Sequence, residues 1–211
     1  MPGHLAASPE FKLSTTAVTG LVLAGGRGSR LGGIDKGLLE LDGEPLVQRV
    51  AQRLAGQVGA LLLSANRNLD RYRALGFEPL TDGPYPDVGP LAGLRAGLLA
   101  CATPWLLAVP CDMPFLPVQL CERLLRAAPA DDPRARVPFD GQRHHYACLL
   151  LPRTALAQVE TALDSGRRSL RELLHAIGWI GVDFAASDPQ AFCNINAQAD
   201  LAALECPAES P

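Results

Sequence analysis

Residues 21–41, LVLAGGRGSRLGGIDKGLLEL, contain the strongest structural signal in the chain. The apolar run 21–23 predicts a buried strand, which stops at Ala24 and is followed by a loop rich in glycine and positive charge. Because glycine lacks a Cβ, successive backbone N–H groups can approach a bound anion closely. The stretch therefore predicts a phosphate-binding loop at the carboxyl end of a strand. Its glycines and cations are Gly25, Gly26, Gly28, Gly32, Gly33, Arg27, Arg30 and Lys36.

Two common nucleotide-binding motifs do not fit this loop. A Walker loop requires Ser or Thr after the lysine, but Gly37 follows Lys36. A dinucleotide-binding motif that begins at Gly26 requires glycine where Leu31 stands. A flexible connector is the alternative, but the flanking apolar segments and the positive charge favour a phosphate loop.

The loop resembles the signature of the molybdenum cofactor guanylyltransferases, which belong to a nucleotidyltransferase group that also includes sugar-phosphate nucleotidyltransferases. Residues 23–26 (LAGG) are similar to the part shared across that group, and residues 32–37 (GGIDKG) resemble the more specific part. The resemblance continues in patches to about Leu204. It implies a Rossmann-like nucleotidyltransferase fold, GTP and molybdopterin as substrates, and Mg²⁺ as cofactor.

Length and composition indicate one α/β domain, which we place at residues 17–206. The chain has 211 residues, 48% of them hydrophobic, and a net charge of −3. This charge gives no overall attraction to nucleic acid or anionic membranes. No apolar run approaches the ~20 residues of a membrane-spanning helix, so we expect a cytoplasmic protein. Residues 1–16 lack periodicity and are expected to be a disordered leader or an expression remnant.

Cysteine and histidine spacing does not indicate a metal site or a disulfide framework. The six cysteines include no CxxC pair and are expected to be reduced thiols, mostly in the core. The adjacent His144 and His145 would point to opposite faces of a strand, which makes a shared metal site unfavourable.

The remaining hydrophobic patterns alternate between strands and helices. This alternation predicts a mostly parallel sheet between two helical layers. The apolar run 60–63 is interpreted as a strand covered on both faces. Pro45 is interpreted as the first residue of a helix, and Ser169 as the cap of another. Further strands are expected at 78–80, 105–109, 135–139, 146–151 and 179–182, and further helices at 69–75, 91–101, 120–128, 155–163, 170–177 and after Asn196.

Asp112 follows the apolar strand predicted at 105–109 and is flanked by Pro110 and Pro114. A carboxylate at the end of such a strand, next to a triphosphate, is a candidate ligand of Mg²⁺. A helix cap or a turn is the alternative role for this aspartate. The resemblance favours the metal, because residues 110–114 (PCDMP) look like the metal-binding segment of the family.

The resemblance also implies the remaining nucleotide contacts. Asp82 would lie next to the nucleotide, and residues 89–93 (GPLAG) would form a loop beside the base. Ser64 departs from the asparagine found in some relatives, so Asn66 is an alternative contact. The expected GTP-binding residues are Leu23, Ala24, Gly25, Gly26, Lys36, Ser64, Asn66, Asp82 and Asp112, with Arg30, Lys36 and Asp112 in catalysis.

Two segments of the second half look like the acceptor side of the family, and they imply Arg168, Asn194 and Asn196 as acceptor-binding residues. Without the resemblance, an arginine pair is usually a solvated surface and Asn-x-Asn is usually a turn. This chain departs from the family here, since Tyr146 replaces a proline and residues 197–198 (AQ) replace Thr-Pro.

The resulting hypothesis is transfer of GMP from GTP to the terminal phosphate of molybdopterin, with release of pyrophosphate. The attacking phosphate is already anionic, so positioning and charge neutralisation are expected to supply the catalysis. The alternatives are a nucleotidyltransferase for another acceptor, such as a sugar phosphate or molybdopterin with CTP, and a regulatory module that binds nucleotide without turnover. Proteins that deliver molybdopterin or mature molybdoenzymes are further partners that the resemblance allows.

Overall fold

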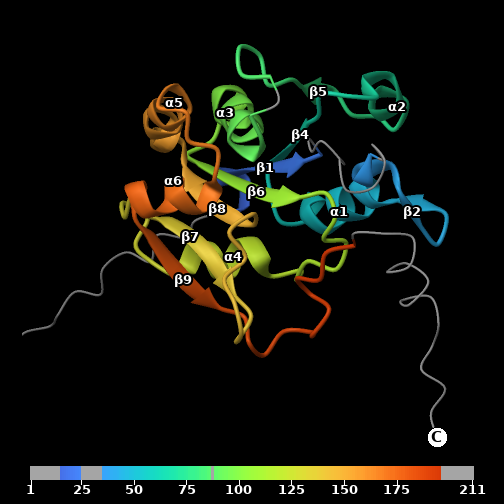
Figure 1. Cartoon of the computed structure of the whole chain (residues 1–211). Helices are drawn as coiled ribbons and strands as arrows, with labels where there is room; N and C mark the ends of the chain where they lie inside the picture. The colour runs from blue at the N-terminus through green and yellow to red at the C-terminus, as the bar shows by residue number, and fades with distance from the viewer. Residues whose placement is uncertain (1–14, 25–34, 87, 196–211) are drawn as a thin grey trace, which may run out of the picture.

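The computed structural model describes residues 15–24, 35–86 and 88–195. Within these residues seven strands form one sheet, in the order β5-β4-β1-β6-β8-β7-β9, and a small hairpin lies apart from it (Figure 1). The sheet contains β1 (Val18–Leu23), β4 (Ala60–Ser64), β5 (Pro79–Leu80), β6 (Trp105–Pro110), β7 (Ala135–Phe139), β8 (Leu149–Pro152) and β9 (Trp179–Asp183), and the hairpin contains β2 (Glu40–Leu41) and β3 (Glu44–Pro45). The helices are α1 (Leu46–Ala55), α2 (Leu69–Ala74), α3 (Pro90–Ala100), α4 (Leu120–Arg126), α5 (Leu156–Asp164) and α6 (Leu170–Ile177), with 3₁₀ turns η1 (Thr15–Ala17), η3 (Lys36–Leu38) and η4 (Arg153–Ala155).

The sheet is mostly parallel. Strands β5, β4, β1 and β6 run parallel, β8 runs antiparallel to both of its neighbours, and β9 is parallel to β7. After β1 the chain moves outward to β4 and β5 and then returns to β6 on the opposite side of β1. Open α/β sheets bind their ligands outside the carboxyl ends of the strands, at such a reversal of strand order. The fold therefore places the expected crevice at the ends of β1 and β6.

Helices cover both faces of the sheet, which gives the three predicted layers (Figure 1). Strand β6 shows the arrangement, because successive side chains of a strand point to opposite faces. Leu107 and Val109 belong to the core that contains residues of α1, α2 and α4. Leu106 and Ala108 belong to the core that contains residues of α3, α5 and α6. The three-layer α/β fold predicted from the sequence is confirmed.

The prediction that β4 is covered on both faces is wrong for its first half. Ala60 is exposed and Leu61 and Leu62 are only partly buried. The outer neighbour, β5, has two residues and pairs only with Leu63 and Ser64. The first half of β4 therefore lies at the edge of the sheet. Its residues are apolar, but they are more exposed than the sequence predicted.

Two element boundaries also differ from the prediction. Strand β8 begins at Leu149 rather than at residue 146, because residues 145–148 form a turn closed by the Cys148 N–H to His145 carbonyl hydrogen bond. Pro45 belongs to the hairpin and caps α1 instead of starting it. Ser169 occupies the cap position of α6 as predicted, although its side chain makes no capping hydrogen bond.

Most of the described cysteines lie in the core, as predicted. Cys101, Cys111, Cys121 and Cys148 are buried, whereas Cys193 is exposed. The helix predicted after Asn196 lies outside the described residues. In the part of the chain that the structure describes, no helix is long and apolar enough to span a membrane.

Candidate active site

The carboxyl ends of β1, β4 and β6 are held side by side by backbone hydrogen bonds that continue beyond the strands. The N–H of Ala24 donates to the carbonyl of Ser64 at 2.8 Å, and the N–H of Cys111 donates to the carbonyl of Leu23 at 3.1 Å. The segment after β1 and the turn after β6 therefore begin next to each other. This is the edge at which the sequence predicted a nucleotide site.

Two of the predicted catalytic residues meet at this edge. Lys36 lies at the start of η3, and its Nζ donates to Asp112 Oδ2 at 2.9 Å. The Lys36 side chain is 30% exposed and that of Asp112 is 11% exposed, so the pair is only partly screened by water. The third predicted catalytic residue, Arg30, lies outside the described residues, as do Gly25 and Gly26.

The second oxygen of Asp112 is suited to a metal ion. Asp112 Oδ1 is buried and has no hydrogen-bond partner among the described residues. A buried carboxylate oxygen without a partner is unfavourable, and hard cations such as Mg²⁺ prefer oxygen ligands of this kind. The described residues hold no group of three or more His, Cys, Asp or Glu side chains placed to bind a metal. A cation at Asp112 would therefore take most of its ligands from phosphate oxygens and water.

Lys36 is positioned by a contact that the sequence analysis missed. Its neighbour Asp35 is buried and accepts two hydrogen bonds from α2 and its cap, from the Tyr72 hydroxyl at 2.6 Å and from Asn68 Nδ2 at 2.9 Å. A Cβ added to Gly37 would lie 2.6 Å from the Tyr72 hydroxyl oxygen, so the glycine allows the close approach. No local pattern connects Tyr72 with Asp35, so this contact could not be predicted from the sequence.

Burial raises the pKa of Tyr72, and the hydrogen bond to Asp35 raises it further. The phenol therefore remains protonated and keeps donating to the carboxylate. Because Asp35 is held from α2, the backbone that carries Lys36 is fixed relative to the end of the sheet. This network is a support for the Lys36 side chain rather than a second catalytic group.

Two further predicted residues connect the ends of β4 and β5. Asn66 Nδ2 donates to Asp82 Oδ2 at 2.6 Å, and the N–H of Asp82 donates to Asn66 Oδ1 at 2.9 Å. Both polar atoms of the Asn66 amide are therefore engaged with Asp82. In this arrangement Asn66 orients the Asp82 carboxylate, and its predicted direct contact with the nucleotide stays a prediction.

The predicted base loop forms the cap and first turn of α3. Gly89 has φ of +89°, a conformation that side chains other than glycine rarely adopt. A Cβ on Gly93 would lie 2.6 Å from Ser64 Oγ, so the glycine lets α3 approach the end of β4 closely. The buried Ser64 therefore lies directly under the start of α3. The amino end of a helix presents unpaired N–H groups, which suits an electron-rich ligand.

The predicted acceptor-side residues come to the same region from two directions. Arg168 is exposed, and its carbonyl oxygen lies 3.7 Å from the position of a Cβ on Gly89. Asn194 is also exposed, and the N–H of the next residue, Ile195, donates to the Asp112 carbonyl at 2.8 Å. Asn196 lies outside the described residues. The fold thus brings Arg168 close to Gly89, in the loop predicted to lie beside the base. It also brings Asn194 and Ile195 next to Asp112.

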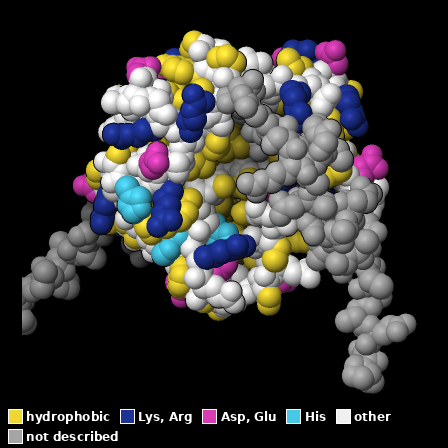
Figure 2. Space-filling view, in the orientation of Figure 1, with side chains coloured by type: hydrophobic (Ala, Val, Ile, Leu, Met, Phe, Trp, Pro, Cys, Tyr) yellow, Lys and Arg dark blue, Asp and Glu magenta, His cyan; other side chains and the backbone are white. Residues whose placement is uncertain are grey.

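The surface of this face suits a ligand that has both ring and phosphate groups. Figure 2 shows hydrophobic side chains on the floor of a hollow near β6 and β8, with Lys and Arg side chains around it. Apolar walls with a few placed charges are typical of small-molecule sites.

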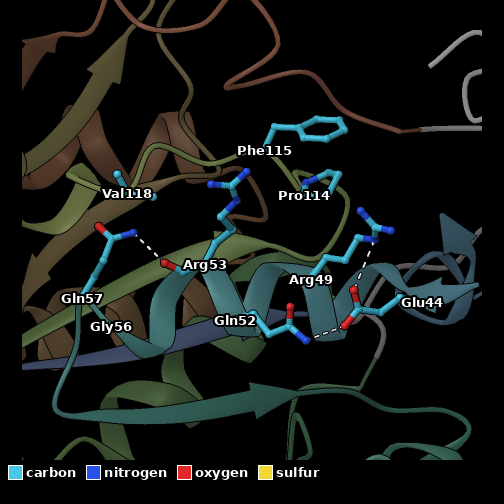
Figure 3. Close-up of a pocket in the computed structure, with 9 residues that line it drawn as sticks. All are labelled: Glu44, Arg49, Gln52, Arg53, Gly56, Gln57, Pro114, Phe115 and Val118. Atoms are coloured by element: carbon cyan, nitrogen blue, oxygen red, sulfur yellow. Dashed lines mark hydrogen bonds and ion pairs between the residues drawn. The ribbon is translucent and has the colours of Figure 1, made fainter. Parts of the chain in front are cut away.

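A separate cavity of about 540 Å³ lies on the outer side of α1 (Figure 3). Its charged side chains already contact one another, since Arg49 forms an ion pair with Glu44, which also accepts a hydrogen bond from Gln52. Phe115 and Val118 border the opposite side of this cavity. Neither Lys36 nor Asp112 lines it, so this cavity is separate from the candidate site at these two residues.

Comparison with known proteins shows clear similarity to one family. Residues 20–178 match the family described as the MobA-like NTP transferase domain. The chain is 43% identical over 195 residues to a molybdenum cofactor guanylyltransferase from Cupriavidus taiwanensis, covering 89% of this chain and 96% of that protein. It is 42% identical over 205 residues to a protein of the same name from Acidovorax ebreus, covering 92% and 97%.

Solved structures share the fold at lower identity. Molybdopterin-guanine dinucleotide biosynthesis protein A from Archaeoglobus fulgidus superposes with a TM-score of 0.72 at 22% identity, covering 89% of this chain and 96% of that one. The 2-C-methyl-D-erythritol 4-phosphate cytidylyltransferase from Thermus thermophilus superposes with a TM-score of 0.63 at 16% identity, covering 87% and 95%. A cytidylyltransferase shares this fold, so the fold alone does not distinguish GTP from CTP.

Proposed function

Because the chain belongs to the molybdenum cofactor guanylyltransferase family, we propose that its Lys36–Asp112 site transfers GMP from GTP to the terminal phosphate of molybdenum-molybdopterin. The products are molybdopterin guanine dinucleotide and pyrophosphate. The observation that carries the assignment of this site is the 2.9 Å contact between Lys36 and Asp112 at the reversal of strand order. The substrates are those expected from the relatives named molybdenum cofactor guanylyltransferase.

The reaction is a displacement at the α-phosphate of GTP. An oxygen of the acceptor phosphate forms the new bond to this phosphorus, and the bond to the bridging oxygen of the β-phosphate breaks. Pyrophosphate leaves with that oxygen and its electron pair. Since the attacking oxygen is already anionic, the protein has to align the reactants and offset negative charge, and no strong general base is required.

Lys36 supplies fixed positive charge at this reaction. Its position is set by Asp112 on one side and by the buried Asp35 next to it in the chain. A cation held in place before the reaction stabilises the charge that develops on the transferred and leaving phosphates without having to reorganise. Arg30, in the segment between β1 and η3 that lies outside the described residues, is proposed as a second cation.

Asp112 is the proposed ligand of Mg²⁺. Its buried Oδ1 has no partner among the described residues, which fits a cation ligand better than a turn or helix cap. When bound, Mg²⁺ supplies charge neutralisation on phosphate oxygens. Oδ2 remains in contact with Lys36, so a single carboxylate would join the lysine and the metal site.

The nucleotide and the acceptor are proposed to bind next to each other at this pair, through different residues. The α3 start, with Gly89 and Gly93, would receive the base, next to Ser64 and Asp82. Arg168 and Asn194 would receive the acceptor, since an arginine can hold a phosphate through two aligned N–H donors. Delivery or maturation proteins are proposed as further partners, and the cytoplasm as the place of action.

A cytidylyl transfer to molybdopterin is the second candidate, because a cytidylyltransferase shares this fold. Pyrophosphate release measured with GTP, CTP and ATP, each with and without molybdopterin, tests both candidates. We expect release with GTP that depends on both molybdopterin and Mg²⁺. Release with CTP in preference to GTP would transfer the assignment to the second candidate. Nucleotide binding without any release would indicate a regulatory module.

A further inference from the structure

The chain returns from β9 to the candidate active site through residues 184–195. The end of this segment is fixed to the site, because the N–H of Ile195 donates to the carbonyl of Asp112 at 2.8 Å. The Ile195 side chain is buried and packs with Leu41 and Leu46 of the β2–β3 hairpin and α1. Asn194, which precedes it, is exposed on the side of the site.

The middle of the segment is held by a ring stack. The buried Phe192 ring lies 4.6 Å from the ring of His145, at an interplanar angle of 19°. Phe192 also forms a T-shaped contact with Phe184, with ring centroids 5.5 Å apart. His145 is 5% exposed, so the stack is shielded from water and adds to the burial of both rings.

His145 is itself oriented by Asp140. His145 Nε2 lies 2.6 Å from Asp140 Oδ2, while Asp140 Oδ1 accepts the N–H groups of Gln142 and Arg143, both at 2.8 Å. Burial lowers the pKa of His145, and this effect outweighs the opposite effect of Asp140. The imidazole is therefore neutral at pH 7 and donates its Nε2–H to the carboxylate. The turn after β7 thus fixes the plane of the ring that Phe192 stacks on.

The start of the segment also contacts the end of β7 and its turn, since the N–H of Phe184 donates to the carbonyl of Phe139 at 2.7 Å and a Cβ on Gly141 would lie 3.0 Å from the Cβ of Ala185. A cavity of about 370 Å³ lies between the turn after β7 and residues 184–193, and its walls include Arg143, Phe184, Ser187 and Phe192. Beside this cavity, the stack of His145 on Phe192 connects the turn with the end of the segment. Only Cys193 separates Phe192 from Asn194, so we expect a displacement of the ring to reach the site.

We infer that His145 is a positioning residue for the acceptor, because its stack on Phe192 fixes Asn194 and the Ile195 peptide against Asp112. The identity of the acceptor rests on the proposed function. His145 does not touch either substrate in this account, and its effect reaches the acceptor through the 192–195 segment.

Three replacements of His145 separate its two contacts. His145→Phe keeps a ring against Phe192 and loses the hydrogen bond to Asp140. His145→Gln keeps an N–H donor for Asp140 and loses the ring, and His145→Ala loses both. We expect the apparent KM for molybdopterin to rise about tenfold or more in His145→Ala, to rise less in His145→Gln, and to stay within about threefold of wild type in His145→Phe. The Kd for GTP should remain near wild type in all three.

A variant of the opposite core layer controls for loss of stability. Val159 is fully buried on α5, in the core cluster that does not contain Phe192. Val159→Ala should lower the midpoint of thermal unfolding without changing the KM for molybdopterin. If Val159→Ala raises this KM as His145→Ala does, or if His145→Ala weakens GTP binding in proportion, His145 has only a structural role and the inference is overturned.

A spectroscopic measurement tests the ring stack without relying on activity. Cys193, next to Phe192, is exposed, whereas Cys101, Cys111, Cys121 and Cys148 are buried. In a Cys206→Ser background a spin label should therefore react with Cys193. The label should be immobilised in the wild-type background and in His145→Phe, and mobile in His145→Ala. Equal mobility in all three backgrounds would overturn the inference. If the spectra behave as expected but no GMP transfer occurs with molybdopterin, the proposed function fails while the ring stack stands.

Discussion

Lys36 Nζ lies 2.9 Å from Asp112 Oδ2, although the two residues are 76 positions apart in the chain and follow different strands. The contact exists because β1 and β6 are parallel neighbours at the reversal of strand order. Two separate functional groups thus become one site with a cation, a carboxylate, and a buried oxygen that can accept a metal ion.

Replacing Lys36 with alanine should reduce GMP transfer strongly while the fold persists. The side chain is partly exposed and supplies charge rather than core packing. Loss of a preorganised charged group at the reacting centre costs about 3 kcal/mol in transition-state stabilisation, or roughly a hundredfold in rate. Single-turnover transfer of labelled GMP measures this effect, and unfolding by urea monitors the fold. A variant that transfers GMP at close to the wild-type rate would show that Lys36 is not the required cation.

Replacing Asp112 with asparagine should shift the Mg²⁺ dependence. The amide has the same shape but no charge, so it attracts a hard cation less strongly. We expect the Mg²⁺ concentration for half-maximal activity to rise about tenfold or more. Lys36→Ala provides the matched control, since it removes a cation close to the metal site and should not raise this concentration. An unchanged Mg²⁺ midpoint in Asp112→Asn would leave Asp112 with a structural role.

The layers and the sheet could be predicted because they depend on local patterns. The run at 105–109 is apolar throughout, and β6 is indeed buried on both faces. The run at 60–63 looks the same, but the burial of its first half depends on the length of β5, which the run itself does not encode. Periodicity predicts the type of an element and its apolar face, whereas burial also depends on neighbours chosen by the fold.

The candidate site was predictable to a similar extent. The glycine-rich loop indicated Lys36, the place of Asp112 after an apolar strand together with family resemblance indicated Asp112, and the fold brings the two together. The contact of Tyr72 with Asp35 could not be predicted, because a tyrosine on the inner face of a short helix looks like any core residue. The stack of His145 on Phe192 could not be predicted either, because His145 follows β7 and Phe192 follows β9, and no local pattern connects them.

Removing the Tyr72 hydroxyl should destabilise the protein and slow the reaction together. Tyr72→Phe leaves one oxygen of the buried Asp35 without its donor, which costs about 1–3 kcal/mol in the free energy of unfolding. The segment that carries Lys36 becomes less well fixed, so kcat should fall. Tyr85→Phe is the matched control, because the Tyr85 hydroxyl also donates to a carboxylate, Asp164, at 2.6 Å, but at an exposed position.

Urea denaturation and steady-state kinetics on both tyrosine variants measure these effects. We expect Tyr85→Phe to change neither stability nor kcat appreciably. The role assigned to Tyr72 would be wrong if the two variants behaved alike, or if Tyr72→Phe lost stability while retaining its full kcat.

Stability should decrease with decreasing pH through His145. Burial lowers its pKa in the folded state, Arg143 and His144 lower it further, and Asp140 opposes them. Below the unfolded pKa of about 6.5 the unfolded chain therefore takes up a proton before the folded one does. The contribution of His145 to the free energy of unfolding is therefore complete above about pH 6.5. It is lost as the pH falls from there toward the pKa of His145 in the folded protein.

The comparison of wild type with His145→Gln isolates this contribution. The free energy of unfolding of wild type should fall more steeply than that of the variant between pH 7.5 and 5, roughly the range over which histidine titrates. Asp140 titrates at lower pH and does not contribute in this range. Burial alone would raise its pKa, but the hydrogen bonds from Arg143, Gln142 and His145 lower it to about 2. Parallel pH profiles for the two proteins would contradict the assignment of a neutral, buried His145.

The most direct test of the Lys36–Asp112 site is a double-mutant cycle on GMP transfer. Labelled GMP would be followed from GTP to molybdopterin in single turnovers of wild type, Lys36→Ala, Asp112→Asn and the double variant. Because the two side chains act as one unit in this account, we expect the double variant to be about as slow as the slower single variant. Rate losses that simply multiply, or a double variant that still forms molybdopterin guanine dinucleotide at a rate near wild type, would contradict a joint catalytic role for Lys36 and Asp112.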